Sequence, residues 1–444
     1  MNRFLTIRAT LVALLLAVLP LHVVSQDDVE RLRIHGSNTV GERLMPALIE
    51  SWLSSIGYKD IKRVARDPAR LEIHAERDDL PLIVEIDKQG SAAGMTDLID
   101  GNSELAMLSR RPNAEELDAA WQLGDLGSPD QEYVIALDGV AIVVHASNPI
   151  RELSVEQLRD IFAGKIRNWS EIGGRAAPIN LHLTGMRSGA REFFQVRVMS
   201  DMRIINTAVV QPGLVRVGKA VALDTSAIGV VGLRSMIPKN ARPLAISNGG
   251  IAVAPTRLNS MSEDYPLVRR YSLYGGQLMS ALGRSLALYA LTGRGQHAVE
   301  RAGHFAVTLR PALQTPALKA LSEYNSMIAG AQRLPVSLRF NFGGTLSIFD
   351  SRSAHDIDRL TAFMRLPQNR GKQAVVVAFV DRSADSRIVS TILSNERADM
   401  VTGILQQRGI VVGRSNGLGT QRPLASPKQP DARFLNERVE VWLL

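Results

Sequence analysis

The chain has 444 residues, of which 45% are hydrophobic and 22% are charged. This composition is typical of packed domains and excludes intrinsic disorder, and the length predicts roughly two to four domains. The absence of cysteine excludes disulfides, thiolate metal sites and cysteine nucleophiles. A net charge of +8 favours anionic partners but does not choose among phosphate, nucleic acid, anionic lipid and an acidic polymer.

The N-terminus has the pattern of a secretory signal peptide. Arg3 and Arg8 precede an apolar run from Leu11 to Leu19, and small residues follow up to Ser25. The apolar run is shorter than the roughly 20 residues that span a bilayer. We therefore expect a signal peptide over residues 1–25, cleaved after Ser25, and a mature chain that is exported to the periplasm and spans no membrane. Export argues against nucleic acid as a partner.

Residues 26–310 alternate predicted strands and helices, which indicates an α/β domain with a largely parallel sheet. A helix over Val40–Leu53 has one apolar face, and Ser154 to Gln157 is a capping box that begins another helix. This stretch is long for a single sheet of this kind, so we expect two lobes with a cleft between them. The predicted strands are Leu82–Ile86, Leu105–Leu108, Val140–Val144, Ile179–Leu183 and Ile228–Leu233.

The C-terminal part of the chain forms a second, smaller domain in this interpretation. Residues 311–335 are less regular and contain three prolines, so they are predicted to be a linker. Residues 336–444 then restart a strand and helix alternation with the order βαβαβ. Its predicted elements are strand Val336–Phe342, helix Ala354–Met364, strand Ala374–Phe379, helix Ser390–Gln407 and strand Arg438–Leu443.

Three strand-to-helix turns of the first domain carry small residues with hydroxyl groups. A helix N-terminus has unpaired N–H groups and a partial positive charge, so such turns favour anions. A single turn of this type is weak support, because Ser and Thr are also ordinary N-caps. Three turns in one domain, with arginines nearby in sequence, favour an anion site. The turns are Gly36-Ser37-Asn38-Thr39, Gly90-Ser91-Ala92-Ala93-Gly94 and Arg187-Ser188-Gly189-Ala190-Arg191.

The stretch from Arg33 to Phe305 resembles the periplasmic phosphate-binding proteins of ABC importers. Besides the three turns, the resemblance rests on motifs spread over the whole stretch. It implies the two-lobed Venus-flytrap fold, inorganic phosphate or a similar anion as ligand, and an ABC importer as partner. The motifs are Leu137-Asp138-Gly139-Val140-Ala141, Phe162-Ala163-Gly164-Lys165, Asn168-Trp169, Tyr265-Pro266-Leu267 and Gly293-Arg294-Gly295-Gln296.

The same resemblance implies the residues that bind the anion. Two positions depart from the family pattern: Ala190 lacks the usual hydroxyl, and Arg110 stands where strict phosphate binders have an aspartate. That aspartate accepts the proton of hydrogen phosphate, so its absence predicts poor discrimination between phosphate and sulfate. The implied anion-binding residues are Ser37, Asn38, Thr39, Ser91, Arg110, Arg187, Ser188 and Gly189.

Residues 336–444 resemble the OmpA-like peptidoglycan-binding domain. The motifs are Phe340-Asn341-Phe342, Leu393-Ser394-Asn395-Glu396-Arg397-Ala398 and Asn436-Glu437-Arg438. The resemblance implies that Asp381 and Arg397 bind the ammonium and carboxylate of diaminopimelate in the peptidoglycan stem peptide. The alternative is a surface salt bridge between them. Glu437 departs from the family pattern, which has an arginine there.

The sequence offers no support for catalysis. It contains no nucleophile elbow, no phosphate-binding loop of the Walker type and no paired histidines with metal-ligand spacing. We therefore expect no catalytic residues, metal or cofactor. The expected function is an exported anion-binding protein held on the cell wall by its C-terminal domain. Two alternatives remain, a structural or signalling adaptor whose flytrap domain has lost its ligand, and an enzyme acting on phosphoryl or cell-wall substrates.

Overall fold

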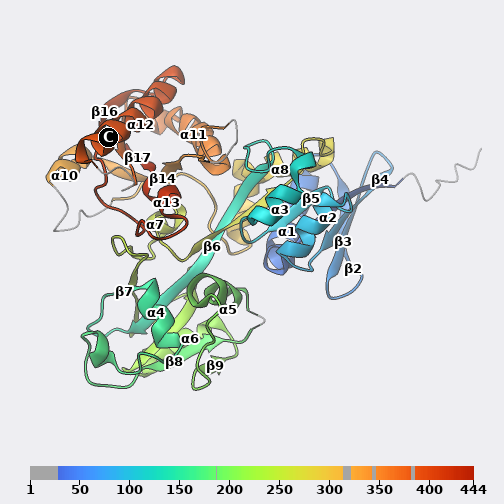
Figure 1. Ribbon diagram of the computed structural model, residues 1–444. Coiled ribbons are helices and arrows are strands. Elements are labelled where there is room, and N and C mark those ends of the chain that lie inside the picture. The colour runs from blue at the N-terminus through green and yellow to red at the C-terminus, as the bar shows by residue number, and fades with distance from the viewer. Residues whose placement is uncertain (1–28, 187, 314–321, 343–346, 382–385) are drawn as a thin grey trace, which may run out of the picture.

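The computed structural model describes residues 29–186, 188–313, 322–342, 347–381 and 386–444. The predicted signal peptide and Arg187 lie outside the described residues. Within those ranges, no helix is long and apolar enough to cross a bilayer. Figure 1 shows two lobes joined by the long strand β6 (Glu132–His145), with a C-terminal domain beside them.

The first lobe is a mixed sheet covered by helices. Strand β1 (Glu30–Gly36) is parallel to both of its neighbours, β4 and β5. Helix α1 (Asn38–Ser55) buries one apolar face, which includes Leu44, Leu48 and Trp52. The other elements are β2 (Lys59–Ala65), β3 (Arg70–Arg77), β4 (Leu80–Asp87), α2 (Ser91–Ile99), β5 (Leu105–Leu108), α3 (Ala114–Ala119), β13 (Val268–Tyr274), α8 (Ala281–Leu291) and α9 (Gly293–Arg301).

The second lobe is built on the C-terminal half of β6, from Val140 to His145. Strand β10 is antiparallel to β6 and parallel to β8, which in turn is parallel to β9. The carboxyl ends of β8, β9 and β10 therefore lie at the same edge. The elements are β7 (Glu152–Ser154), α4 (Val155–Phe162), β8 (Asn180–Thr184), α5 (Gly189–Phe194), β9 (Val209–Gln211), α6 (Leu214–Leu223), β10 (Ala227–Gly232), β11 (Ala241–Pro243), β12 (Ala245–Ser247) and α7 (Arg257–Met261).

The C-terminal domain has its own sheet, with strand order β14-β17-β15-β16, and its own apolar core. Tyr324 packs its ring against Phe379 and Trp442, which fastens the first helix of this domain to one face of the sheet. The elements are α10 (Ser322–Ile328), β14 (Gln332–Arg339), α11 (Ser351–Met364), β15 (Ala374–Phe379), α12 (Arg387–Gln407), β16 (Val412–Gly417), α13 (Ala432–Asn436) and β17 (Arg438–Leu443).

The C-terminal domain contacts both lobes. On the first lobe, Arg270 of β13 forms an ion pair of 2.6 Å with Asp350, the residue that caps α11. On the second lobe, the backbone N–H of Ser426 donates to the carbonyl of Asn248 at 2.9 Å, and Leu424 joins the apolar core. The C-terminal domain therefore helps to fix the position of the two lobes relative to each other.

A buried carboxylate lies at the centre of this interface. Glu263, in the segment between α7 and β13, pairs with Arg270 at 2.7 Å and with Arg352 of α11 at 2.8 Å. Burial raises the pKa of Glu263, but the charges of Arg270 and Arg352 outweigh burial and hold that pKa well below its usual value. The ionised form of Glu263 thus stabilises the attachment of the C-terminal domain.

The sheets differ from the sequence-based expectation in three respects. The expectation of a largely parallel sheet is wrong, because β2, β3 and β4 form antiparallel hairpins and β13 is antiparallel to both β5 and β6. The βαβαβ order omitted β16, whose sequence Val412–Gly417 contains glycine, arginine, serine and asparagine instead of an apolar run. Strand β14 also begins at Gln332, inside the stretch predicted to be a linker.

Candidate functional site

Two turns of the first lobe are held together through glycines. Gly36, which ends β1, has φ +143°, and a Cβ there would lie 2.1 Å from the carbonyl oxygen of Met107 on β5. The carbonyl of Gly36 accepts a hydrogen bond from the N–H of Gly90 at 2.8 Å. A Cβ on Gly94 would lie 2.5 Å from the Cα of Gly36, so α2 packs directly on the first turn. The glycines in both predicted turns therefore permit close backbone approach.

The hydroxyl groups of these turns have different local roles. Ser37 is only 3% exposed, and its Oγ accepts from the N–H of Val40 at 3.4 Å, so it caps α1. Asn38 is exposed and Thr39 is half-buried. The Oγ of Ser91 accepts from the N–H of Ser109 at 3.2 Å. These residues lie at the carboxyl ends of β1, β4 and β5, where α/β proteins commonly bind ligands.

The third turn, from the second lobe, reaches the first turn across the cleft. Ser188 precedes α5, and its side chain makes no capping hydrogen bond. A Cβ on Gly189 would lie 2.7 Å from Oγ1 of Thr39 and 3.3 Å from Nη2 of Arg269. Thr39, Gly189 and Arg269 therefore meet where the two lobes approach one another.

Arg269 is the buried cation of this site. Its guanidinium donates to Oδ2 of Asp138 on β6 at 3.0 Å and to the hydroxyl of Tyr271 at 2.9 Å. Tyr271 also donates to Asp138 at 2.5 Å. Burial raises the pKa of Asp138, but the charge of Arg269 and the hydrogen bond from Tyr271 outweigh it and lower that pKa. The three side chains form a rigid ionic group at β6, the strand that joins the two lobes and is here called the hinge.

Arg110 is engaged inside the first lobe. It makes a two-point pair with Glu116, with distances of 2.6 and 2.5 Å, and the hydrogen bond with Glu116 raises its pKa despite burial. It also lines a cavity of about 320 Å³ together with Ser109 and Arg269. Phe434 of the C-terminal domain lines the same cavity. The charge of Arg110 is therefore balanced by its own lobe.

Most of the predicted anion-binding residues lie in turns that converge, two of them have another local role, and one lies outside the described residues. The described parts of the three turns converge, although Arg187 lies outside the described residues. Ser37 is committed to capping, and Arg110 is committed to an ion pair. Sequence reasoning missed Arg269. The available signal was the Arg269-Arg270 pair within an otherwise uncharged strand, because charges that become buried in a strand must find partners.

Asp381 and Arg397 of the C-terminal domain contact two adjacent residues, Asn436 at the end of α13 and Glu437 after it. Oδ1 of Asp381 accepts from the side-chain amide of Asn436 at 2.7 Å. Arg397 lies 3.7 Å from Glu437 and stacks over the ring of Phe340 at 4.5 Å. Glu437, which departs from the family pattern, thus offers Arg397 a carboxylate from within the chain. Among the described residues, no group of three or more His, Asp or Glu side chains is placed to hold a metal ion.

Comparison with known proteins gives the following findings. Residues 69–291 match the PBP superfamily domain. The phosphate-binding protein PstS 2 of Streptococcus agalactiae is 38% identical over 89 residues, which are 20% of this chain and 27% of that protein. The phosphate-binding protein PstS of Pseudomonas aeruginosa is 25% identical over 205 residues, 43% of this chain and 62% of that protein. Both matches span less than two thirds of the relatives' own length.

Among solved structures, the chain matches a crystal structure of an ABC-type phosphate transport receptor from Vibrio cholerae. It is 22% identical, with a TM-score of 0.49, and the match covers 62% of this chain and 99% of that chain.

Proposed function

Because the chain belongs to the PBP superfamily, we propose that its two lobes capture a small oxyanion and that phosphate is this ligand. The observation that carries the proposal is the meeting of Thr39, Gly189 and Arg269 at the cleft. The relatives named above support phosphate, since both are named phosphate-binding proteins. They are binding proteins rather than enzymes, and this chain has a binding function as well.

In the proposed mechanism, the lobes close around the anion. N–H groups at the start of α1 and α2 and the hydroxyls of Thr39, Ser91 and Ser188 donate hydrogen bonds. Arg269 supplies positive charge in a fixed orientation, because Asp138 and Tyr271 hold its guanidinium. Ser109 adds a further hydroxyl beside Ser91. Such an arrangement binds an anion with donors that are already oriented.

Calorimetric titration of the mature chain with inorganic phosphate tests this proposal. Ser91→Ala and Ser188→Ala should each weaken binding by about 1–3 kcal/mol, because each removes a hydrogen bond to a charged ligand. Ser54→Ala is the matched control, since Ser54 is exposed on α1, outside the three turns, and its hydroxyl donates to the carbonyl of Glu50 in the same helix. Unchanged affinity in both site variants would refute the assignment of these serines.

We further propose that the C-terminal domain attaches the protein to peptidoglycan through Asp381 and Arg397. The support is that the two side chains contact the adjacent residues Asn436 and Glu437, with Arg397 held only loosely by Glu437 at 3.7 Å. A stem-peptide carboxylate would displace Glu437, and its ammonium would bind Asp381. This proposal implies a protein that is exported and bound to the cell wall.

Sedimentation with purified sacculi tests the attachment. The mature chain should pellet with the sacculi, and Asp381→Ala and Arg397→Ala should each release it into the supernatant. Arg408→Ala is the control, because Arg408 is a surface residue at the end of α12 that pairs with Asp358. A folded wild-type chain that never pellets would exclude attachment, whereas pelleting that survives both changes would exclude the two residues.

A second candidate is an adaptor whose flytrap domain binds no anion. The observation in its favour is that Arg110 is paired with Glu116 and that Phe434 of another domain lines the cavity beside it. Absence of binding to inorganic phosphate at millimolar concentration would favour this alternative.

A further inference from the structure

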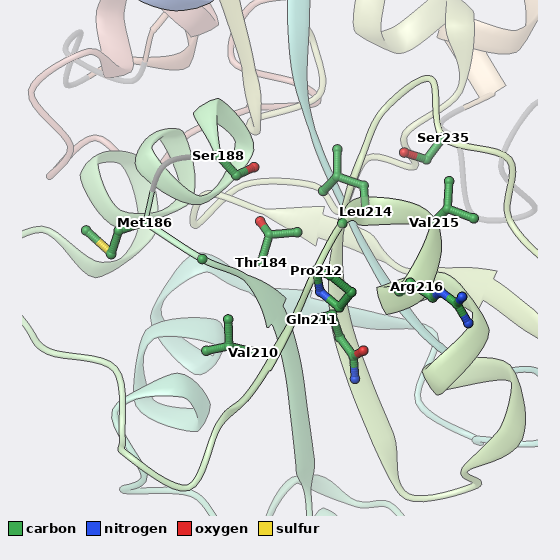
Figure 2. A pocket seen from close by; sticks show the side chains of 12 residues that line it. Thr184, Met186, Ser188, Val210, Gln211, Pro212, Leu214, Val215, Arg216 and Ser235 are labelled. Atoms are coloured by element: carbon green, nitrogen blue, oxygen red, sulfur yellow. The ribbon is translucent and has the colours of Figure 1, made fainter.

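The second lobe carries a groove of about 1200 Å³ at the carboxyl ends of β8, β9 and β10. Figure 2 shows the groove between the turn that precedes α5 and the start of α6. Cavities for drug-sized organic ligands measure about 300–1,000 Å³, so this space is far larger than an inorganic anion needs. It is lined by Thr184, Gly185, Met186, Ser188, Val210, Gln211, Pro212, Gly213, Leu214, Val215, Arg216 and Ser235.

Polar side chains line one part of the groove. Thr184, the last residue of β8, is one of them and is only 5% exposed. The hydroxyl of Ser188 makes no capping bond. Arg216 has no ion pair with any described residue and lies at the opposite side of the groove (Figure 2). Hydroxyl and guanidinium groups donate hydrogen bonds to anionic oxygens, so these side chains are suited to a ligand that carries an anionic group.

The rest of the lining is apolar and open to solvent. Met186, Val210 and Val215 are 65%, 63% and 62% exposed. Clustered apolar side chains at a surface mark binding sites in soluble proteins, because covering them removes apolar area from water. The groove therefore suits a ligand that has an apolar body as well as an anionic group.

The groove lies next to the proposed anion site. Ser188 lines the groove, and the next residue, Gly189, faces Thr39 and Arg269 across the cleft. A phosphoryl group bound at the three turns would thus lie beside the Ser188 end of the groove, where a substituent on it has access to the groove. An inorganic phosphate would leave the apolar wall uncovered.

We infer that the phosphate site prefers an organic phosphate, in which a phosphoryl group carries an apolar substituent that fills the groove of the second lobe. This inference rests on the proposed oxyanion function and specifies its substrate class. The shared chemistry is a phosphoryl dianion joined to an apolar group, and it occurs in both phosphate monoesters and phosphonates. Phosphate itself then binds only through the anionic half of the site.

Calorimetry on the mature full-length chain with inorganic phosphate, phenyl phosphate and phenylphosphonate tests the inference. At least one of the two organic ligands should bind ten-fold or more tightly than inorganic phosphate. If one of them binds more tightly, the preferred class is the phosphate monoester or the phosphonate, respectively. Equal binding means that the site recognises the phosphoryl group and the apolar group that both ligands share. Val210→Trp, which fills the groove, should abolish the preference and leave the affinity for inorganic phosphate within two-fold.

Leu223→Trp is the matched control, because Leu223 is 88% exposed at the far end of α6 and outside the groove. Binding of inorganic phosphate with no preference for either organic ligand would overturn the inference and leave the proposed function intact. A preference that survives Val210→Trp would overturn the assignment to this groove. If no ligand binds the folded wild-type chain, the proposed function fails, and the inference fails with it.

Discussion

At the scale of single residues, the ionic group at the hinge has the largest energetic consequences. Arg269 is 8% exposed and pairs with Asp138 and Tyr271. Removing one member of a buried pair leaves the other charge without compensation, which costs about 3–5 kcal/mol. Surface pairs such as Arg63 with Glu50 contribute about 0–1 kcal/mol.

Arg269→Gln should therefore lower the free energy of unfolding by up to about 3–5 kcal/mol, the cost for a fully buried pair, because the Asp138 side chain is 26% exposed and keeps some contact with water; it should also weaken phosphate binding. Urea unfolding measures the first effect, and calorimetric titration measures the second. Arg63→Gln is the control and should change the stability by less than about 1 kcal/mol. Equal losses in the two variants would show that the hinge group does not stabilise the fold.

The sequence identifies the turns but not this ionic group. The turns follow a local pattern of strand, glycine, hydroxyl residue and helix, which needs no knowledge of distant contacts. Arg269 and Asp138 are separated by 131 positions, and their pairing depends on the register of β13 against β6. Only the folded sheet brings them together, so no local pattern could have assigned the role of Arg269.

At the scale of elements, a capping box predicts a helix start well, whereas α11 and α12, predicted from their apolar pattern, begin three residues before the predicted starts. The capping box predicted at Ser154 is confirmed: its side chain accepts from the N–H of Gln157, and the Gln157 side chain accepts from the N–H of Ser154. Strands β15 and β17 have the predicted bounds, because each is buried and apolar enough to stand out. Strand β16 was missed because it lies at an edge of its sheet, where polar side chains are tolerated.

Ser154→Ala should lower the free energy of unfolding by about 1 kcal/mol, the usual cost of losing an N-cap. Thermal or urea unfolding of the mature chain measures it. Ser154→Asp should restore most of the loss, since aspartate caps helices as well as serine does. A larger loss that aspartate fails to restore would point to a role of Ser154 beyond α4.

At the scale of the whole molecule, the attachment of the C-terminal domain depends on ionised carboxylates. The pKa of Glu263 is held well below its usual value, as described above, and Arg270 and Arg111 also lower the pKa of Asp350 against the effect of burial. The sequence resembles one family in each of its two domains, but neither resemblance predicted this interface. The residues that form it belong to different domains and lie far apart in the chain.

A carboxylate with a lowered pKa in the folded state stabilises the protein above its unfolded pKa, and this stabilisation is lost as the pH falls. The stability of the mature chain should therefore decrease as the pH drops below about 4.3, the ordinary value for glutamate. Glu263→Gln should be less stable at neutral pH and should show a shallower decrease with acid. Urea unfolding at a series of pH values measures both slopes. Parallel slopes for wild type and variant would mean that Glu263 does not contribute.

The contact of the C-terminal domain with both lobes has a thermodynamic consequence. If closing the cleft around an anion changes the interface at Asn248 or Arg270, then the anion and any partner of the C-terminal domain alter each other's affinity. Such coupling is reciprocal: the factor by which the partner changes anion affinity equals the factor by which the anion changes partner affinity. A protein with this architecture would report the anion concentration of its surroundings to whatever holds its C-terminal domain.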